Sequence, residues 1–174
     1  MTALRPISIA RMLIGLLWLG SLRWKLPPDF DGGSQTGLRE WLQLEVDHAA
    51  FGAYGSVIEE LVLPNFTFFA WTLFFVELLV GLSLLTGTFT RLSAGIGLAL
   101  SINLGIGLLD VPGEWPWSYV MLAMWHGLFL VVGAGRIWGL DGLLVESSLA
   151  RRSRLFRVLI GSSALSNTTE GMSS

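Results

Sequence analysis

Four stretches of this sequence are apolar and long enough to cross a lipid bilayer as helices. They cover residues 7–22, 66–87, 92–109 and 117–138. The hydrocarbon core of a bilayer is about 30 Å thick and takes roughly 20 helical residues to cross. Lipid offers no partner to an open backbone amide, so each stretch is expected to be helical. The composition agrees, because 52% of the 174 residues are apolar and 14% are charged, with a mean hydropathy of +0.63. We therefore expect an all-α membrane protein, a four-transmembrane-helix bundle.

The third stretch could also be interpreted as a strand, because GIGLALSINLGIGL (95–108) alternates small and large residues. A lone strand would leave unpaired edges in lipid, and so we favour a helix. On a helix, small residues recur at a spacing of four on two faces, which lets neighbouring helices approach closely. These residues are Gly95, Ala99, Asn103 and Gly107 on one face, and Gly97, Ser101 and Gly105 on the other. This helix is therefore expected at the centre of the bundle.

The cations predict how the chain lies in the membrane. With the N-terminus inside, all of the 11 Lys and Arg residues except Arg23, Lys25 and Arg39 fall on the cytoplasmic side. Both termini are then cytoplasmic, in a multi-pass protein of the cytoplasmic (inner) membrane. No small-residue cleavage site follows the first stretch, so we expect it to stay attached. Residues 1–145 would form the membrane domain, followed in residues 146–174 by a basic amphipathic cytoplasmic segment and a disordered tail.

The connection between the first two stretches, residues 23–65, is long and acidic. LREWLQLEV (38–46) places its apolar residues on one helical face, which is typical of a helix lying in the headgroup layer. In SVIEELVL (56–63), Ser56 and Glu59 have the spacing of a capping box, and a proline follows. We predict two short amphipathic helices that form an outer lid over the bundle. The alternative is an ordinary interfacial loop.

One carboxylate, Glu77, stands in the middle of FTFFAWTLFFVELLVGLSLLTG (66–87), which carries no other charge. An ionised, unpaired acid costs several kcal/mol at that depth, so it is protonated, paired or facing a hydrated cavity. His126 in the fourth stretch lies at a similar depth, and the two side chains could share a proton. Tyr119 falls on the same helical face as His126. The alternative for Glu77 and His126 is a structural hydrogen bond between helices.

Arg11 and Arg23 are twelve residues apart, about 18 Å of helix, too short for both to reach water without snorkelling. Either both snorkel, or Arg11 turns inward to neutralise a carboxylate or to contact the polar head of a ligand. At the inner rim, we expect structural ion pairs that fix two helix ends. Their members would be Arg91, Arg136 and Asp141.

The sequence also excludes several chemistries. It contains no cysteine, which excludes a disulfide relay, an Fe–S cluster and a c-type haem attachment. One histidine, His126, lies in a predicted span, whereas a bis-histidine haem in the bilayer would need two. No Walker, dinucleotide-binding or zinc-protease motif is present. We predict no haem, metal or Fe–S cofactor and no nucleic-acid partner, so an electron carrier would have to be bound from outside the chain.

Four segments together carry a resemblance to known proteins. They are ARMLIGLLWLGSLRWKL (10–26), VELLVGLSLLTGTFTRLSAGIGL (76–98), GEWPWSY (113–119) and GAGRIWGLD (133–141). These segments are similar to the DoxX/DoxD family of four-helix membrane proteins. The long outer loop ending in LPNF (63–66) is closer to the DoxD branch, the membrane subunit of thiosulfate:quinone oxidoreductase. The residues that match the family pattern are Arg11, Lys25, Glu77, Gly81, Arg91, Gly135, Arg136 and Asp141. The resemblance implies a bundle that works at the quinone pool with a second subunit as partner.

The leading hypothesis is a quinone-binding pocket among the four helices, with Glu77 and His126 as catalytic residues that exchange protons with the ring oxygens of the bound quinone. Candidate contacts for the substrate or quinone are Arg11, Trp18, Arg23, Lys25, Phe74, Asn103, Tyr119 and Trp125. Trp18, Phe74 and Trp125 would form apolar walls. The outer cations Arg23, Lys25 and Arg39 would attract an anionic sulfur donor such as thiosulfate.

Two other functions stay open. The chain would also suit a non-catalytic accessory subunit of a larger respiratory or photosynthetic membrane complex, because its small-residue stripes and basic tail favour packing against other subunits and lipid. A small carrier for a lipid or a weak acid, with Glu77 as its proton-linked group, is the third function.

Overall fold

The computed structural model describes residues 5–31, 37–136 and 138–145. All regular elements within these ranges are helices, and no strand occurs among them, which confirms the all-α class. The helix favoured for residues 95–108 is likewise confirmed. The amphipathic segment and tail predicted for residues 146–174 lie outside the described residues.

Four long helices correspond to the four apolar stretches. They are α1 (Arg5–Ser21), which continues as the 3-10 helix η2 (Leu22–Lys25), α4 (Phe66–Thr86), α5 (Thr90–Gly107) and α6 (Pro116–Val132). α6 ends before the expected residue 138, because Gly133 has a left-handed φ of 64° and terminates the helix. Among the described helices, Arg5–Lys25 and Phe66–Thr86 are long and apolar enough to cross a membrane, and α6 is a shorter apolar helix.

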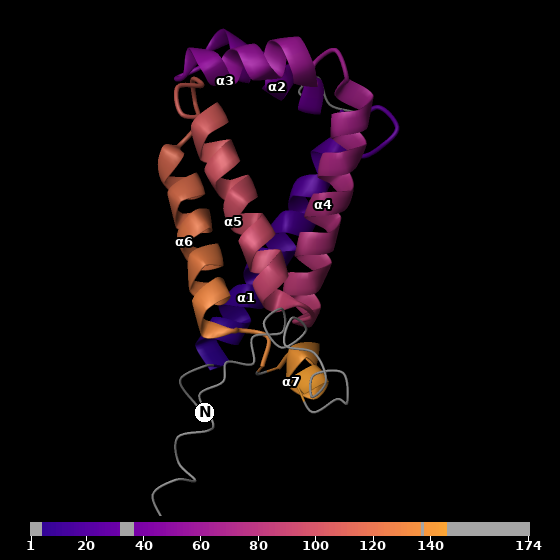
Figure 1. Ribbon diagram of the computed structural model, residues 1–174, viewed down its shortest axis with the longest axis vertical. Coiled ribbons are helices and arrows are strands. Elements are labelled where there is room, and N and C mark those ends of the chain that lie inside the picture. The colour runs from indigo at the N-terminus through magenta and orange to yellow at the C-terminus, as the bar shows by residue number, and fades with distance from the viewer. Residues whose placement is uncertain (1–4, 32–36, 137, 146–174) are drawn as a thin grey trace, which may run out of the picture.

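The long helices form two pairs, α1 with α4 and α5 with α6, which converge at one end and diverge toward the other (Figure 1). Three short helices cross the wide end: α2 (Leu38–Asp47), α3 (Gly52–Val57) and the π-helical turn η3 (Ile58–Val62). We call these three helices the lid, and the end that they cover the lid end. α7 (Leu140–Val145) lies at the opposite end.

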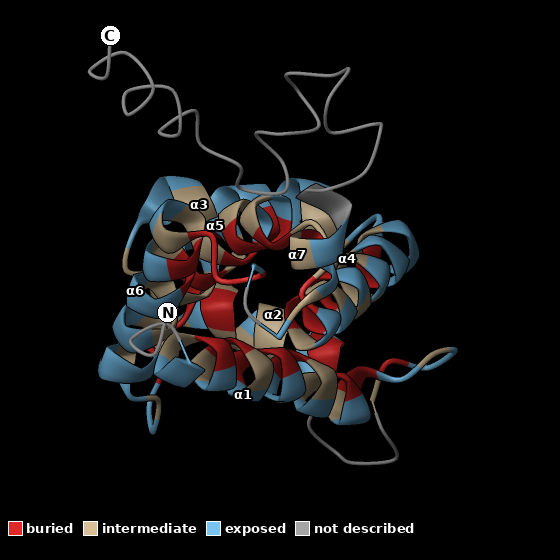
Figure 2. Ribbon diagram, turned by 90° about the horizontal axis from the view of Figure 1, so that it is seen from below, coloured by how far each residue is buried: buried red, intermediate tan, exposed pale blue. Residues whose placement is uncertain are grey.

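Seen along its axis, the bundle is a ring in which α1 packs on α4, α4 on α5, α5 on α6 and α6 on α1 (Figure 2). α4 and α6 therefore occupy opposite corners. The central position expected for α5 is wrong, because this helix forms a corner as well. The small residues of α5 do not face helices on two sides. Gly97 leaves room for His126 of α6, and Gly107 leaves room for Glu45 of α2 in the lid.

Glycines bring α1 and α4 into backbone contact. A Cβ atom added at Gly15 would lie 2.7 Å from the backbone nitrogen of Leu85, and one added at Gly81 would lie 2.8 Å from Cδ2 of Leu19. Such small-residue contacts are typical of helices that associate in lipid. The core between the helices is formed by Ile14, Trp18, Val80, Leu84, Ala94, Phe129 and Ala134.

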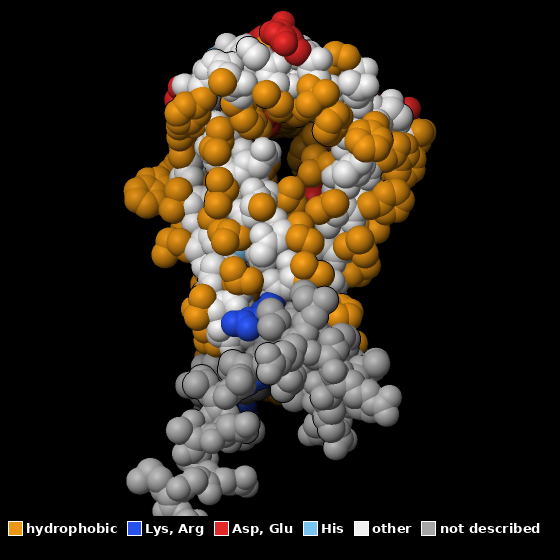
Figure 3. Space-filling model, in the orientation of Figure 1, with side chains coloured by type: hydrophobic (Ala, Val, Ile, Leu, Met, Phe, Trp, Pro, Cys, Tyr) orange, Lys and Arg blue, Asp and Glu red, His pale blue; other side chains and the backbone are white. Residues whose placement is uncertain are grey.

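Large apolar side chains cover much of the outside of the bundle (Figure 3), and several charged side chains are buried inside it beside the apolar core. Exposed side chains include Leu13, Leu79, Met124 and Val131, whereas the buried ones include Arg11, Glu77, His126 and Asp141. In proteins surrounded by water, charged side chains are rarely fully buried and exposed apolar patches are usually small.

Buried polar residues close the end opposite the lid. Arg11 donates hydrogen bonds to the backbone carbonyl groups of Leu84, Leu85 and Trp138. Arg11 is fully buried and does not line the cavity, so the expectations of snorkelling and of ligand contact are wrong. The inward turn toward a carboxylate is confirmed, because the guanidinium interacts electrostatically with Asp141. The carbonyl groups at the last turn of α4 lack helical partners, and the guanidinium supplies donors for them.

Asp141 and Arg91, two of the three residues expected to form ion pairs at this end, bind backbone groups. Asp141 accepts hydrogen bonds from the amides of Phe89 (2.7 Å) and Thr90 (2.8 Å), so it caps the start of α5. Arg91 donates from Nε to the carbonyl oxygen of Leu130 (2.8 Å). The side chain of Arg136 is exposed. A carboxylate cap and a carbonyl contact thus fix the two helix ends that ion pairs were expected to fix.

Candidate functional site

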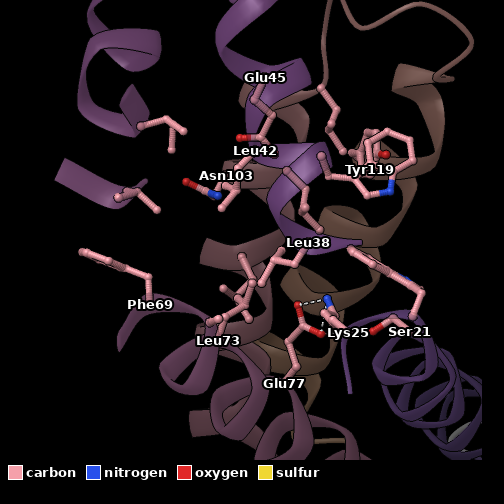
Figure 4. A pocket seen from close by; sticks show the side chains of 18 of the residues that line it. Ser21, Lys25, Leu38, Leu42, Glu45, Phe69, Leu73, Glu77, Asn103 and Tyr119 are labelled. Atoms are coloured by element: carbon pink, nitrogen blue, oxygen red, sulfur yellow. Dashed lines mark hydrogen bonds and ion pairs between the residues drawn. The ribbon is translucent and has the colours of Figure 1, made fainter. Parts of the chain in front are cut away.

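A cavity of about 760 Å³ lies beneath the lid, between the two helix pairs (Figures 3 and 4). A volume of this size is typical of sites that bind a small organic molecule. Its walls are largely apolar and come from all four long helices and from the underside of the lid. Polar side chains gather in two groups: Ser21, Lys25 and Glu77 between α1 and α4, and Glu45, Tyr54, Asn103, Glu114 and Tyr119 toward the lid.

Glu77 is held by Lys25. The ammonium Nζ lies 2.5 Å from the carboxylate, and the Ser21 hydroxyl donates to Oε2 at 3.1 Å. Lys25 is 4% exposed and Glu77 1% exposed, so both charges have left solvent. Ser21 and Lys25 are one helical turn apart because η2 extends α1 to residue 25, past the expected end of the first span at residue 22. A buried pair of this kind is strongly destabilised when one partner alone is removed.

The proton-sharing contact expected between Glu77 and His126 is wrong, because each side chain bonds elsewhere. Nδ1 of His126 lies 2.7 Å from the carbonyl oxygen of Leu122, and Nε2 lies 3.0 Å from the indole Nε1 of Trp18. The carbonyl group requires a proton on Nδ1, and the indole N–H requires a lone pair on Nε2. His126 is therefore a neutral imidazole with both nitrogens occupied. It is fully buried outside the cavity wall, so it cannot exchange protons with a ligand there.

The position of the His126 ring explains Gly97. A Cβ atom at residue 97 would lie 2.2 Å from Nε2 of the imidazole, so only glycine leaves room for the ring at this height of α5. The ring in turn links α6 to α1 through Trp18. The Trp18–His126 contact confirms the structural alternative for His126, a hydrogen bond between helices.

A second carboxyl group, Glu45, reaches the cavity from the lid. It accepts a hydrogen bond from the Tyr54 hydroxyl at 3.0 Å, and that hydroxyl also lies 3.5 Å from Oδ1 of Asn103 on α5. Burial raises the pKa of Glu45 above its ordinary value of 4.5, and the Tyr54 hydrogen bond opposes that rise. Burial, together with Glu45, raises the pKa of Tyr54 as well. The Tyr119 hydroxyl donates to Glu114 in the same region.

Sequence reasoning missed Glu45 and Tyr54. Glu45 is seven residues after Leu38 and three after Leu42, so it lies on the apolar face of α2 rather than on its acidic face. An acid at that position of an otherwise amphipathic pattern is the signal that could have found it. Tyr54 carries no comparable signal, because its contact with Glu45 depends on how α3 packs against α2.

The structure brings some of the predicted contact residues to the cavity and not others. Trp18, Lys25, Asn103, Tyr119 and Glu77 line it. Phe74 packs instead against Trp71 and Phe75 on α4, with ring centroids 6.2 and 5.7 Å away. Trp125 is 36% exposed on the outside of α6. Phe74 and Trp125 are therefore wrong as cavity walls, and Phe69 and Leu73 occupy the α4 side of the cavity in place of Phe74.

The three outer cations do not gather at one mouth. Lys25 is buried against Glu77, Arg23 is exposed outside the cavity wall, and Arg39 stands over the ring of Phe66 at 4.2 Å. The expected contact of Arg23 with a ligand is thus wrong. An anion entering this cavity would meet one cation that is already neutralised.

Comparison of the chain with protein-family models, with curated proteins and with solved structures gives no match. The cavity and its charged groups therefore carry the functional argument.

Proposed function

We propose that the chain is an integral protein of the inner membrane, that its four long helices span the bilayer, and that both termini lie on the cytoplasmic side. Three observations support this placement. Two of the described helices are long and apolar enough to cross a membrane, and large apolar side chains cover the outside of the bundle. Arg11 and Glu77, the charged residues furthest inside the long helices, are buried, and Glu77 is paired with Lys25, as expected for a protein whose solvent is lipid. The lid would then lie at the outer surface.

Within this placement, the lid cavity would bind a quinone, and the protein would act at the quinone pool. The apolar walls suit a quinone ring and its methyl substituents, and Trp18 and Tyr119 offer aromatic edges. The Lys25 ammonium stands at one side, and because it has three N–H donors it can give one to a ring oxygen while keeping its contact with Glu77. The resemblance to the DoxX/DoxD family supports the same ligand.

Reduction of a quinone to a quinol consumes two electrons and two protons. Lys25 is the group placed to give one proton to a ring oxygen, which leaves a neutral amine beside the Glu77 carboxylate at 2.5 Å. A proton taken up from water would then pass through Glu77 to restore the ammonium, and a second turn of the same relay would protonate the other ring oxygen and restore the pair. In this proposal Lys25 takes the role first expected of His126. The electrons would come from a reduced sulfur anion, thiosulfate or a related donor, oxidised with the help of a second subunit.

The observation that carries this proposal is a buried ion pair in the wall of a largely apolar cavity. Three tryptophans, Trp18, Trp24 and Trp41, line that cavity, so quenching of their fluorescence by a short-chain quinone reports binding. The protein would be purified into lipid nanodiscs and titrated with the quinone. Replacing both charges, in Lys25→Met with Glu77→Gln, should weaken binding by at least about tenfold, the cost of one charge-assisted hydrogen bond.

The matched control is Glu60→Gln, which removes an exposed lid acid outside the cavity wall and should leave the affinity unchanged. Wild-type protein that shows no saturable quenching would contradict quinone binding. An affinity that the double variant leaves unaltered would contradict the role of the ion pair.

A non-catalytic accessory subunit is the second candidate, and one observation favours it. Gly20 on α1 and Gly127 on α6 have open space where a side chain would stand, so a helix of another subunit could approach either surface closely. Isolation of the chain in a large membrane complex, together with absence of quinone binding, would favour this role over the first.

A further inference from the structure

We infer that the ligand enters the cavity sideways from the bilayer, between α4 and α5 in the lid-side half of the membrane, and that it is a molecule with a compact polar head and a long apolar tail. This inference rests on the membrane placement in the proposed function and deepens it. To the proposed quinone site it adds a route of entry and the shape of the ligand.

The two helices that would border the route, α4 and α5, diverge (Figure 1). α4 and α5 are joined by a tight turn at the end opposite the lid, where Gly87 adopts a φ of 70°, and they separate toward the lid (Figure 1). The space-filling view shows the surface between them hollowed below the lid, with an acidic side chain inside the hollow (Figure 3). We call this hollow the window.

The rim of the window is largely apolar. Residues of both helices line the cavity and are also partly or fully exposed, as expected for side chains at an opening: Phe69 and Leu73 on α4, and Leu100, Asn103 and Leu104 on α5. All are apolar except Asn103. An apolar rim at the depth of the acyl chains favours passage of hydrocarbon and disfavours passage of ions.

The ion pair lies deeper in the cavity than the lid does (Figure 4). Lys25 and Glu77 lie inside the cavity, whereas the lid helices cover its outer end (Figure 4). A polar head that binds at the ion pair therefore leaves its tail to run out through the window into lipid. Keeping the tail in lipid avoids burying it in protein, so tail length need not match the cavity volume.

A second opening faces the window across the bundle and provides the competing route. Leu17 on α1 lines the cavity and is 61% exposed, and Ser118 on α6 lines it from the other side and is exposed as well. This rim carries polar groups, including Glu114 and Tyr119 near the lid. We assign the tail to the apolar window for that reason.

The test uses a reporter cysteine, which is clean because the chain has no cysteine of its own. Ser21→Cys is nearly isosteric and places a thiol in the cavity beside the Lys25–Glu77 pair. Two reagents are compared in vesicles of phosphatidylcholine: an alkyl maleimide dissolved in the bilayer, and a charged maleimide dissolved in water.

The window is then narrowed with Asn103→Trp, an exposed rim position where added volume fills the opening rather than the core. Ile102→Trp is the matched control, because residue 102 is exposed on the same helix but lies outside the cavity wall. Leu17→Trp narrows the competing opening. Asn103→Trp should slow labelling by the alkyl maleimide by about tenfold, with Ile102→Trp and Leu17→Trp close to the parent rate.

Slowing by Leu17→Trp in place of Asn103→Trp would overturn the assigned route. Fast labelling by the charged maleimide, unaffected by Asn103→Trp, would show entry from water and overturn the inference as well. No quinone takes part in this assay, so its outcome is independent of the fluorescence titration. A protein that binds no quinone but labels through the window would refute the quinone and keep the route.

Discussion

Removal of Lys25 alone should destabilise the protein far more than removal of the ion pair as a whole. Nζ of Lys25 lies 2.5 Å from the Glu77 carboxylate, and both residues are nearly inaccessible. Lys25→Met therefore leaves the Glu77 carboxylate buried with the Ser21 hydroxyl as its one remaining donor among the described residues. Breaking a buried pair in this way costs about 3–5 kcal/mol, whereas replacing both charges with neutral groups of similar volume is close to neutral.

These free energies translate into a measurable shift of the unfolding temperature. For a chain of this length, 1 kcal/mol corresponds to roughly 2–4 °C, so Lys25→Met should lower the midpoint by roughly 6–20 °C. The second change, Glu77→Gln, should restore most of that loss. Thermal unfolding in one detergent, followed by circular dichroism, gives the four corners of the double-mutant cycle and hence the coupling free energy of the pair.

Arg23→Met is the matched control, because Arg23 is an exposed cation of the same 3-10 helix. Its removal should change the midpoint little, since exposed charges contribute at most about 1 kcal/mol. A Lys25→Met variant as stable as Arg23→Met would refute the reasoning. So would a double variant that is no more stable than Lys25→Met, because the cost would then not arise from an uncompensated charge.

Three further predictions concern the surroundings of the cavity. Gly97→Ala should lower stability by about 1–3 kcal/mol by displacing the His126 ring, whereas Gly127→Ala, which has open space, should be neutral or slightly stabilising; thermal midpoints distinguish the two. Glu45 has a raised folded pKa, so its contribution to stability is present below pH 4.5 and is lost as pH rises through the raised value. Glu45→Gln should therefore gain stability relative to wild type as pH increases, and parallel pH profiles of the two midpoints would contradict this. Arg11→Met leaves three carbonyl groups without their donor and should cost at least about 2 kcal/mol, measured by denaturant unfolding; a cost below about 0.5 kcal/mol would contradict the cap.

The four long helices could be predicted from the sequence because each follows an apolar run, although α6 ends at Gly133 before its run does. The bounds of α4, Phe66–Thr86, differ from the predicted 66–87 by one residue, since Gly87 ends the helix where the apolar run ends. The unusual position of Glu77 could be recognised in the same way. A single charge in an apolar stretch needs compensation, whatever the fold.

The partners could not be predicted, because they depend on which helices are neighbours. Depth along the membrane normal placed Glu77 and His126 at the same level, but α4 and α6 occupy opposite corners of the ring. Trp18 on α1 therefore bonds His126, and Lys25 reaches Glu77 from the 3-10 extension of α1. The sequence pattern stops at the end of the apolar run and does not reveal that η2 continues the helix to residue 25.

The most direct measurement is a structure of the protein in lipid nanodiscs with a long-tailed quinone present at saturating concentration. We predict density for a flat ring beneath the lid, with one ring oxygen within hydrogen-bond distance of Lys25 Nζ and the tail leaving between α4 and α5. An empty cavity with intact Lys25–Glu77 contact, or ring density elsewhere on the bundle, would contradict the account.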